Sequence, residues 1–189
     1  MVRGKLVFIT GGVRCGKSRY AEQYLMNEHA TRNVYVASGV ATDREMEQRI
    51  AYHQRDRAGY PVDWITIEQP RQMEQLPASI RKGDGILWDC VTTWLANELY
   101  VSDMEVVEKQ LLKTIDQLLQ KVKVIVIVSN EVLDEQVAGY ESVILYQQWI
   151  GRIHQNLVAK ADEAYEVCPS VALFLFYGQK GVHFFSSVS

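Results

Sequence analysis

A glycine-rich loop near the start of the chain constrains its fold more than any other feature. The loop consists of Gly11, Gly12, Val13, Arg14, Cys15, Gly16, Lys17 and Ser18. An apolar run at residues 6–9 precedes it, and a segment with helical character at residues 18–29 follows it. Strand, loop and helix in this order are the context in which G-x-x-x-x-G-K-[ST] forms a phosphate-binding loop. The alternative, a plain strand-to-helix turn, is disfavoured by the complete motif and its correct flanks.

The residue types in this loop predict how it binds its ligand. Glycines allow backbone N–H groups to surround phosphate oxygens, and the N-terminus of the following helix adds the positive end of its dipole. Lys17 is expected to reach the β- and γ-phosphates, and the Ser18 hydroxyl is expected to hold Mg²⁺. The loop therefore predicts that the chain binds a nucleoside triphosphate, ATP or GTP, together with Mg²⁺.

Length and composition predict one soluble domain over residues 1–189. A chain of 189 residues can bury a substantial core, and 48% hydrophobic with 23% charged residues is typical of globular proteins. A net charge of −3 argues against a broad basic surface for nucleic acid. The sequence contains no apolar run long enough to span a membrane and no secretory signal pattern at its start. We therefore expect a cytoplasmic protein without nucleic-acid or membrane partners.

The cysteines support the same compartment. Cys15, Cys90 and Cys168 are odd in number and lack metal-ligand spacing, which favours reduced thiols. Cys15 lies inside the phosphate loop, where a helix N-terminus would make its thiol sensitive to oxidation. The simpler interpretation, that Cys15 only supplies a small side chain, is favoured.

Apolar strands alternate with helices along the chain. Strands are expected at residues 6–9, 33–38, 64–67, 86–90, 123–128, 164–167 and 171–176, with a last apolar piece at 182–185. Helices are expected at residues 18–29, 43–58, 71–81, 91–100, 103–120 and 140–161, the third interrupted by Pro77. This order predicts an α/β fold with three layers, in which a mostly parallel sheet carries helices on both faces.

Two of the expected helices have apolar residues that we assign to the core. In the helix at 103–120 these residues are Val106, Val107, Leu111, Ile115, Leu118 and Leu119. In the helix at 140–161 they are Val143, Ile144, Trp149, Ile153 and Leu157. We expect these side chains to pack against the sheet and not against a partner protein.

Two strand ends deliver polar residues to the edge where open α/β sheets bind ligands. Asp89 follows the apolar run 86–88, and downstream of a phosphate loop such an acid usually lies beside Mg²⁺. The segment 129–131, Ser-Asn-Glu, follows the strand at 123–128. We therefore predict Ser18 and Asp89 as the Mg²⁺ ligands. Because a strand that ends in Asp is common, a purely structural Asp89 is the alternative.

A basic row on the helix expected at 43–58 carries the less obvious chemistry. Arg49, His53 and Arg57 are spaced four residues apart and therefore share one stripe of the helix. Two guanidinium groups around an imidazole suit a polyphosphate ligand, and neighbouring positive charge favours the neutral imidazole that acts as a nucleophile. From spacing alone, a solvated basic face is the more common explanation. His29, His154 and His183 lack such a setting.

In order along the chain, several segments resemble one enzyme family. They are Thr10–Arg19, Tyr35–Ser38, Arg49-Ile50 with His53, Pro61–Trp64 with Glu68, Leu87–Leu95 with Asn97, Val128–Val132, Gly151–Ile153 with Gln155, and Ala161-Asp162. The chain thereby resembles the bifunctional adenosylcobinamide kinase / adenosylcobinamide-phosphate guanylyltransferases of cobalamin assembly. The phosphate loop is generic, whereas Arg-Ile-x-x-His with the downstream Trp and Asn-Glu is specific to this family.

The resemblance implies a RecA-like phosphate-loop fold, commonly a homotrimer, and two reactions on a corrinoid partner. The first phosphorylates adenosylcobinamide with ATP or GTP, and the second transfers GMP from GTP to that phosphate and releases pyrophosphate. The guanylylated histidine of the family falls on His53, and Lys17 is the second catalytic residue. The nucleotide contacts fall on the loop residues Gly11 to Ser18 and on Ala37, Ser38, Gly39, Gln54, Arg55, Asp56, Arg57, Glu68 and Asp89.

The chain departs from the family pattern after Glu131. A glycine-rich segment with a proline is usual there, followed by a basic and acidic cluster, but this chain has Val-Leu-Asp-Glu-Gln-Val-Ala at 132–138 and Leu-Tyr-Gln-Gln-Trp at 145–149. One alternative is therefore a guanylyltransferase whose kinase activity is lost or altered. Another is a nucleotide-dependent regulatory or binding protein without transfer chemistry, since a phosphate loop alone does not distinguish these classes.

Overall fold

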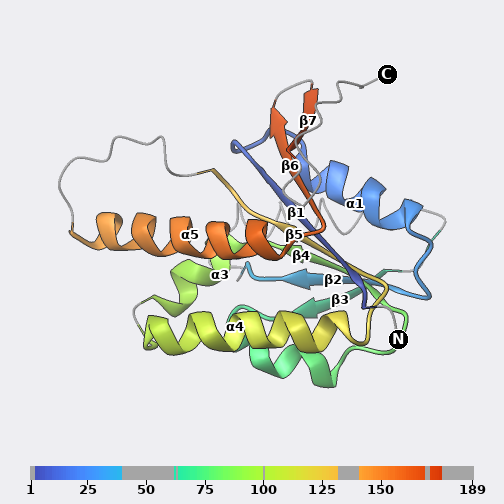
Figure 1. The fold of residues 1–189 in the computed structure, drawn as a ribbon, viewed down its shortest axis with the longest axis horizontal. Coiled ribbons are helices and arrows are strands. Elements are labelled where there is room, and N and C mark those ends of the chain that lie inside the picture. Colours follow the sequence, from blue (N-terminus) through green and yellow to red (C-terminus); the bar gives the residue numbers. More distant parts are fainter. Residues whose placement is uncertain are drawn as a thin grey trace.

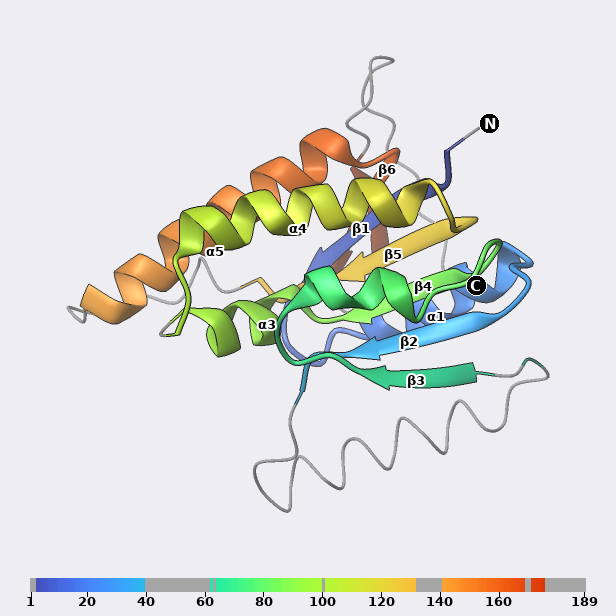
Figure 2. The same ribbon diagram turned by 90° about the horizontal axis from the view of Figure 1, so that it is seen from below.

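The computed structural model describes residues 3–39, 62, 64–99, 101–131, 141–168 and 171–175. Within this part of the chain, seven strands form one sheet in the order β3-β2-β4-β5-β1-β6-β7 (Figures 1 and 2). Neighbouring strands pair in parallel, except that β6 and β7 are antiparallel at one edge. The parallel register sets Ala37 beside Asp89, and Asp89 beside Val128. The carboxyl ends of β2, β4 and β5 therefore lie next to one another.

The elements follow the predicted alternation closely. The strands are β1 Lys5–Gly11, β2 Asn33–Ala37, β3 Trp64–Glu68, β4 Gly85–Asp89, β5 Val124–Val128, β6 Glu163–Cys168 and β7 Val171–Leu175. The helices are α1 Lys17–Asn27, the 3-10 helix η1 Met73–Ala78, α3 Val91–Glu98, α4 Met104–Leu119 and α5 Glu141–Lys160. Apart from the helix expected at 71–81, the predicted strands and helices at these places are confirmed, with boundaries that differ by a few residues.

Alternation of side chains along the strands builds two cores, one on each face of the sheet. On one face, Val7 and Ile9 of β1 and Leu87 of β4 pack with Ala21 and Leu25 of α1. The opposite face carries the larger core, in which strand residues pack with η1, α3, α4 and α5. Figures 1 and 2 show α1 on one side of the sheet and α4 and α5 side by side on the other. The predicted three-layer α/β arrangement is confirmed.

Three details of the helices differ from the sequence prediction. The helix expected at 71–81 is only the short 3-10 helix η1, which contains Pro77. A 3-10 helix is tolerated there because Pro77 lacks the N–H that a continuing α-helix needs. Val106 of α4 and Ile144 of α5 were predicted in the core but are 48% and 46% exposed. Val106 and Val107 are adjacent, so their side chains point about 100° apart around the helix and only one of the two can face the sheet.

Other predictions fall on residues that the structure does not describe. The helix expected at 43–58 and the apolar piece at 182–185 lie outside the described residues. Within the described part, no helix is both long and apolar enough to cross a membrane.

Candidate nucleotide-binding site

The phosphate loop joins β1 to α1 in a conformation that requires two of its glycines, Gly11 and Gly16. A side chain at Gly11 would overlap the carbonyl oxygen of Val167, because β1 and β6 pair at these two residues. Gly16 caps the N-terminus of α1 with a φ of 93°, in the left-handed region where side chains are strained. Arg14 also has a positive φ, of 60°. The backbone N–H groups at the start of α1 are thereby placed at the carboxyl edge of the sheet, where a phosphate group fits.

Lys17 lies inside the loop and not in solvent. Its side chain is 6% exposed, and its Nζ donates a hydrogen bond of 2.8 Å to the carbonyl oxygen of Gly12. The Gly12 carbonyl is a neutral partner, so this bond places no counter-charge beside the ammonium group. This geometry agrees with the predicted contact between Lys17 and phosphate oxygens, which stays a prediction.

Ser18 and Asp89 are 71 residues apart in sequence but meet in the fold. The Ser18 hydroxyl donates a hydrogen bond of 3.1 Å to Oδ2 of Asp89, and the Tyr35 hydroxyl donates one of 2.9 Å to the same oxygen. Hydroxyl and carboxylate oxygens are the ligands that Mg²⁺ prefers. Among the described residues, no group of three or more His, Cys, Asp or Glu side chains is placed to hold a metal. The pair therefore fits a Mg²⁺ site completed by phosphate and water, the usual arrangement for this ion.

The segment after β5 packs directly against the loop. The N–H groups of Ser129 and Glu131 donate to the carbonyl oxygens of Ile9 and Gly11, at 2.9 Å and 3.0 Å. The Asn130 amide donates to the Thr92 hydroxyl at 2.9 Å. These bonds fix the position of this segment at the ligand edge of the sheet, as its place after β5 predicted.

Two potential nucleophiles near the loop are held in their neutral forms. Burial raises the pKa of the Cys90 thiol, which also has hydrogen-bond contacts with Thr92 and Thr93. Burial lowers the pKa of His154 to about 4, and its Nε2 pairs with the Ser129 hydroxyl at 2.7 Å. Sequence analysis gave His154 no chemical role, and nothing in the local pattern of α5 indicated its contact with a strand end. Its partner Ser129 is fully buried, so this pair is structural.

The predicted nucleotide contacts on β2 and β3 lie at one place. Ala37 pairs with Glu68 on one side and with Asp89 on the other. Ser38 is fully buried, and its hydroxyl accepts a hydrogen bond of 2.7 Å from the Trp88 indole. The structure thus brings Ala37, Ser38, Gly39 and Glu68 to the same sheet edge as Asp89. Their contacts with nucleotide stay predictions, and the Trp88 bond is a feature that the sequence did not reveal.

The remaining predicted site residues cannot be placed. His53 with its neighbours Arg49, Gln54, Arg55, Asp56 and Arg57 lies outside the described residues.

Comparison with known proteins identifies the family. The family model for cobinamide kinase / cobinamide phosphate guanyltransferase, CobU, matches residues 7–175. The chain belongs to this family. The match begins in β1 and ends with β7, so it includes the phosphate loop, Asp89, the segment after β5 and the positions of the His53 row. The resemblance based on short motifs is confirmed along nearly the whole chain.

Individual relatives agree with this assignment. The chain is 30% identical over 182 residues to the bifunctional adenosylcobalamin biosynthesis protein CobU of Salmonella typhimurium, covering 89% of this chain and 98% of that protein. It is 34% identical over 155 residues to the bifunctional adenosylcobalamin biosynthesis protein CobP of Pseudomonas aeruginosa, covering 82% and 87% of the two chains. The RadB recombinase structure has a TM-score of 0.54 at 11% identity and covers 96% of this chain and 84% of that one, which shows the RecA-like fold alone.

Proposed function

We propose that this protein phosphorylates adenosylcobinamide with ATP or GTP and then transfers GMP from GTP to the product. The observation that carries the proposal is the family match over residues 7–175. The pairing of Ser18 with Asp89 beside the buried Lys17 supports it, because phosphoryl transfer depends on positioned charge and Mg²⁺. The expected products are adenosylcobinamide-GDP and pyrophosphate, and the activity belongs to the assembly of cobalamin.

In the kinase step, the described residues bind and orient the triphosphate. Lys17 exchanges the Gly12 carbonyl for oxygens of the β- and γ-phosphates, which neutralises charge as the γ-phosphoryl group leaves. Ser18 and Asp89 would hold Mg²⁺, which would neutralise phosphate charge during the transfer. Tyr35 donates to the same carboxylate oxygen of Asp89 as Ser18 and so orients that carboxylate from β2. The corrinoid hydroxyl attacks the γ-phosphorus, the bond from that phosphorus to the β-phosphate oxygen breaks, the nucleoside diphosphate leaves, and the hydroxyl proton passes to solvent.

In the second step, His53 is proposed as the nucleophile. One imidazole nitrogen attacks the α-phosphorus of GTP, the bond to the β-phosphate oxygen breaks, and pyrophosphate leaves. A phosphate oxygen of adenosylcobinamide phosphate then attacks the same phosphorus, the N–P bond breaks, and free histidine is regenerated. Covalent capture divides one difficult transfer into two easier displacements. Arg49 and Arg57, four residues on either side, would neutralise the phosphate charge.

A second candidate function is supported by the departures of the sequence after Glu131. The chain lacks the glycines, the proline and the basic and acidic cluster that the family pattern has in that region. If those residues shape the site for the corrinoid hydroxyl, the protein transfers GMP to a phosphorylated corrinoid but does not make that phosphate itself.

Product analysis separates these functions. The protein is incubated with adenosylcobinamide and ATP or GTP, and separately with adenosylcobinamide phosphate and GTP, and the products are identified by mass. Conversion of both substrates supports the bifunctional enzyme, whereas conversion of the phosphate alone supports the second candidate. Failure to convert either substrate would contradict both and favour a regulatory nucleotide-binding protein.

The role of His53 is tested with GTP labelled at the α-phosphate. We expect label on the denatured wild-type protein that is labile in acid and stable in base, and none on His53→Asn. Arg49 and Arg57 cannot replace the nucleophile because they stay protonated. Tyr52→Phe is the matched control, since Tyr52 lies about 100° away around the expected helix and should not affect labelling. Persistent label on His53→Asn would assign the nucleophile to another residue. Kinase activity should survive in this variant.

A further inference from the structure

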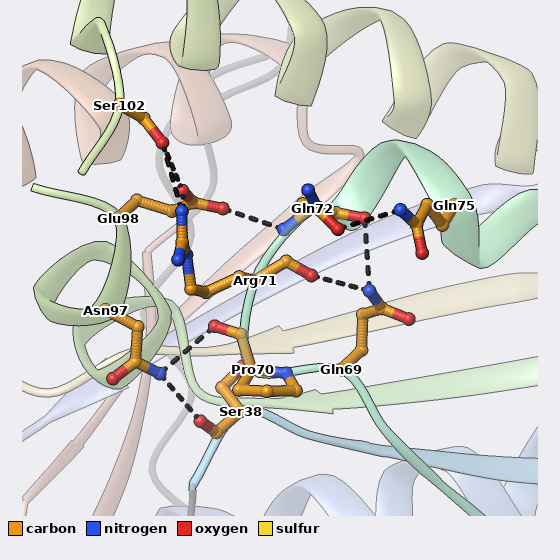
Figure 3. Close-up of polar contacts among 9 residues, drawn as sticks. All are labelled: Ser38, Gln69, Pro70, Arg71, Gln72, Gln75, Asn97, Glu98 and Ser102. Atoms are coloured by element: carbon orange, nitrogen blue, oxygen red, sulfur yellow. Dashed lines mark hydrogen bonds and ion pairs between the residues drawn. The ribbon is translucent and has the colours of Figure 1, made fainter.

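The side-chain amide of Asn97, near the end of α3, joins the ends of two strands. Its Nδ2 donates a hydrogen bond of 3.0 Å to the carbonyl oxygen of Ser38 and another of 3.0 Å to that of Pro70 (Figure 3). Ser38 directly follows β2, and Pro70 follows β3 by two residues. Both hydrogens of one amide group are thus used on carbonyl groups that have left the sheet and need a new donor.

On the β2 side, Ser38 is held by three hydrogen bonds to two neighbouring elements, β4 and α3. Its N–H donates to the backbone carbonyl oxygen of Asp89 at 3.0 Å, its hydroxyl accepts from Trp88, and its carbonyl accepts from Asn97. Since Ser38 lies between Ala37 and Gly39, these bonds determine where both of its neighbours lie relative to Asp89. The bond from Asn97 attaches this strand end to α3.

On the β3 side, the turn at residues 69–72 is attached to the same helix. The Gln69 N–H donates to the Ala37 carbonyl oxygen at 2.8 Å, and the Gln69 amide donates to the carbonyl oxygens of Arg71 and Gln72. Glu98, the residue after Asn97, is 3% exposed and accepts from the Gln72 N–H at 2.7 Å and from the Ser102 hydroxyl at 2.8 Å. Figure 3 shows Asn97 and Glu98 facing this turn. The turn therefore keeps one position relative to α3.

Glu68, the last residue of β3, directly precedes this turn, and its backbone pairs with Ala37. Asn97 therefore adds a side-chain link, beyond the backbone pairing, between the two strand ends on which Ala37, Ser38, Gly39 and Glu68 are predicted to contact the nucleotide. None of its bonds reaches the phosphate loop, which is carried by β1 and α1. The phosphate-binding and strand-end parts of the site are thus supported by different contacts.

We propose that Asn97 is a positioning residue for the nucleoside part of GTP: it holds the ends of β2 and β3 in the spacing that recognises the nucleoside, while the phosphate loop binds the triphosphate independently. This inference rests on the proposed function, in which GTP occupies this edge of the sheet. It goes beyond that function by assigning a task to a residue that is not expected to touch nucleotide.

The test measures the affinity of the full chain for Mg²⁺-GTP and for Mg²⁺-tripolyphosphate, which lacks the nucleoside. Asn97→Ala removes both hydrogen bonds, and Asn97→Asp replaces the two N–H donors by a charge that faces two carbonyl oxygens. Asn156→Ala is the matched control, because its amide donates to Glu108 at 2.7 Å between α5 and α4, away from the strand ends. Thermal unfolding of every variant is recorded in parallel.

We expect both Asn97 variants to bind GTP about tenfold more weakly than wild type, because two neutral hydrogen bonds are lost. The affinity of Asn97→Asp for GTP should be no higher than that of Asn97→Ala. Affinity for tripolyphosphate should not change, and Asn156→Ala should bind both ligands like wild type. A general loss of stability would weaken the binding of both ligands or of neither. Weaker binding of GTP alone therefore identifies a positioning role. Because Asn97→Ala adds no charge, it keeps the test valid if Asn97→Asp does not fold.

Wild-type affinity for GTP in both Asn97 variants would overturn the inference, and so would equal weakening of GTP and tripolyphosphate. The transfer assay is run on the same samples. If wild type binds GTP but makes no adenosylcobinamide-GDP, the proposed function fails while the affinity split still decides the role of Asn97. If wild type does not bind GTP, both proposals are overturned.

Discussion

Strand β4 has an aspartate at each end, Asp84 just before its first residue and Asp89 as its last, and the two carboxylates have different kinds of partner. Asp84 is 1% exposed and accepts hydrogen bonds from the guanidinium of Arg32, at 3.1 Å for Nε, and from the backbone N–H of Arg81 at 2.8 Å. Asp89 accepts from the hydroxyls of Ser18 and Tyr35. A cation neutralises the first carboxylate, whereas neutral donors orient the second.

The two lysines that flank β1 differ in the same way. Lys5, at the amino end, forms ion pairs with Glu28 at 3.0 Å and Glu163 at 2.9 Å. Lys17, beyond the carboxyl end, donates to a backbone carbonyl. In these two pairs, the charges at the amino edge of the sheet are used in stability, and Lys17 and Asp89 at the carboxyl edge have only neutral partners in these bonds. This agrees with the general rule that open α/β sheets bind ligands outside the carboxyl ends of their strands.

The largest expected effect concerns the two lysines. Lys17→Ala should reduce the rate of every step that uses a nucleoside triphosphate by about two to three orders of magnitude, because a charge contact to the phosphates is lost. Lys5→Ala should leave the rates unchanged and lower the free energy of unfolding by about 1 kcal/mol, since its ion pairs are partly exposed. Rates and urea unfolding curves of both variants check this. A normal turnover rate in Lys17→Ala would contradict the assignment of the phosphate loop.

The next effect separates the two aspartates. Asp89→Asn should raise the Mg²⁺ concentration needed for half-maximal activity about tenfold or more, because an amide keeps the shape of the carboxylate without its charge. Its melting temperature should stay the same or rise, since no cation loses a partner. Asp84→Asn should behave in the opposite way. Its Mg²⁺ titration should not change, and its free energy of unfolding should fall by about 2 kcal/mol or more, because Arg32 is left without its buried charged partner. Equal Mg²⁺ titrations for Asp89→Asn and wild type would make Asp89 structural.

The sequence predicted those parts of the site that depend on local pattern. The phosphate loop is one continuous segment, and the run before Asp89 is apolar enough to form a buried strand. Ser18 and Asp89 were both predicted as Mg²⁺ ligands. In the fold, the Ser18 hydroxyl lies 3.1 Å from Oδ2 of Asp89, because β4 and β1 lie on either side of β5. Local pattern and the rule for strand ends were sufficient to bring these two residues to one site, while their role as Mg²⁺ ligands stays a prediction.

The side-chain bonds that hold the ends of β2 and β3 were not predictable in this way. The bonds of Asn97 to Ser38 and Pro70 span 59 and 27 residues, and they exist because α3 packs over the ends of β2 and β3. Amide side chains lack a pattern that indicates such partners. The exposed Val106 shows a related limit, since apolar character alone did not tell which of two adjacent residues faces the sheet.

The smallest expected effect concerns Glu163, at the amino edge, and is a change in stability with pH. Burial opposes the ionisation of Glu163, but hydrogen bonds from Tyr24, Lys5 and Tyr165 outweigh it, so its pKa lies below the ordinary value. A lowered pKa in the folded state means that Glu163 stabilises the protein above the pKa of an unfolded glutamate, about 4.3. That contribution is lost as the pH falls from there through the folded pKa.

The free energy of unfolding of Glu163→Gln should therefore be about 1 kcal/mol lower than that of wild type at pH 7, and this difference should shrink below about pH 4. Urea unfolding at a series of pH values measures this difference directly. Asp116→Asn is the matched control, because its ion pair with Lys160 is exposed and should contribute almost nothing at either pH. Because Glu163 lies at the edge that we assign to stability, the KM for GTP should be the same in wild type and in Glu163→Gln. A raised KM in Glu163→Gln would show that the two edges of the sheet do not divide stability and binding between them.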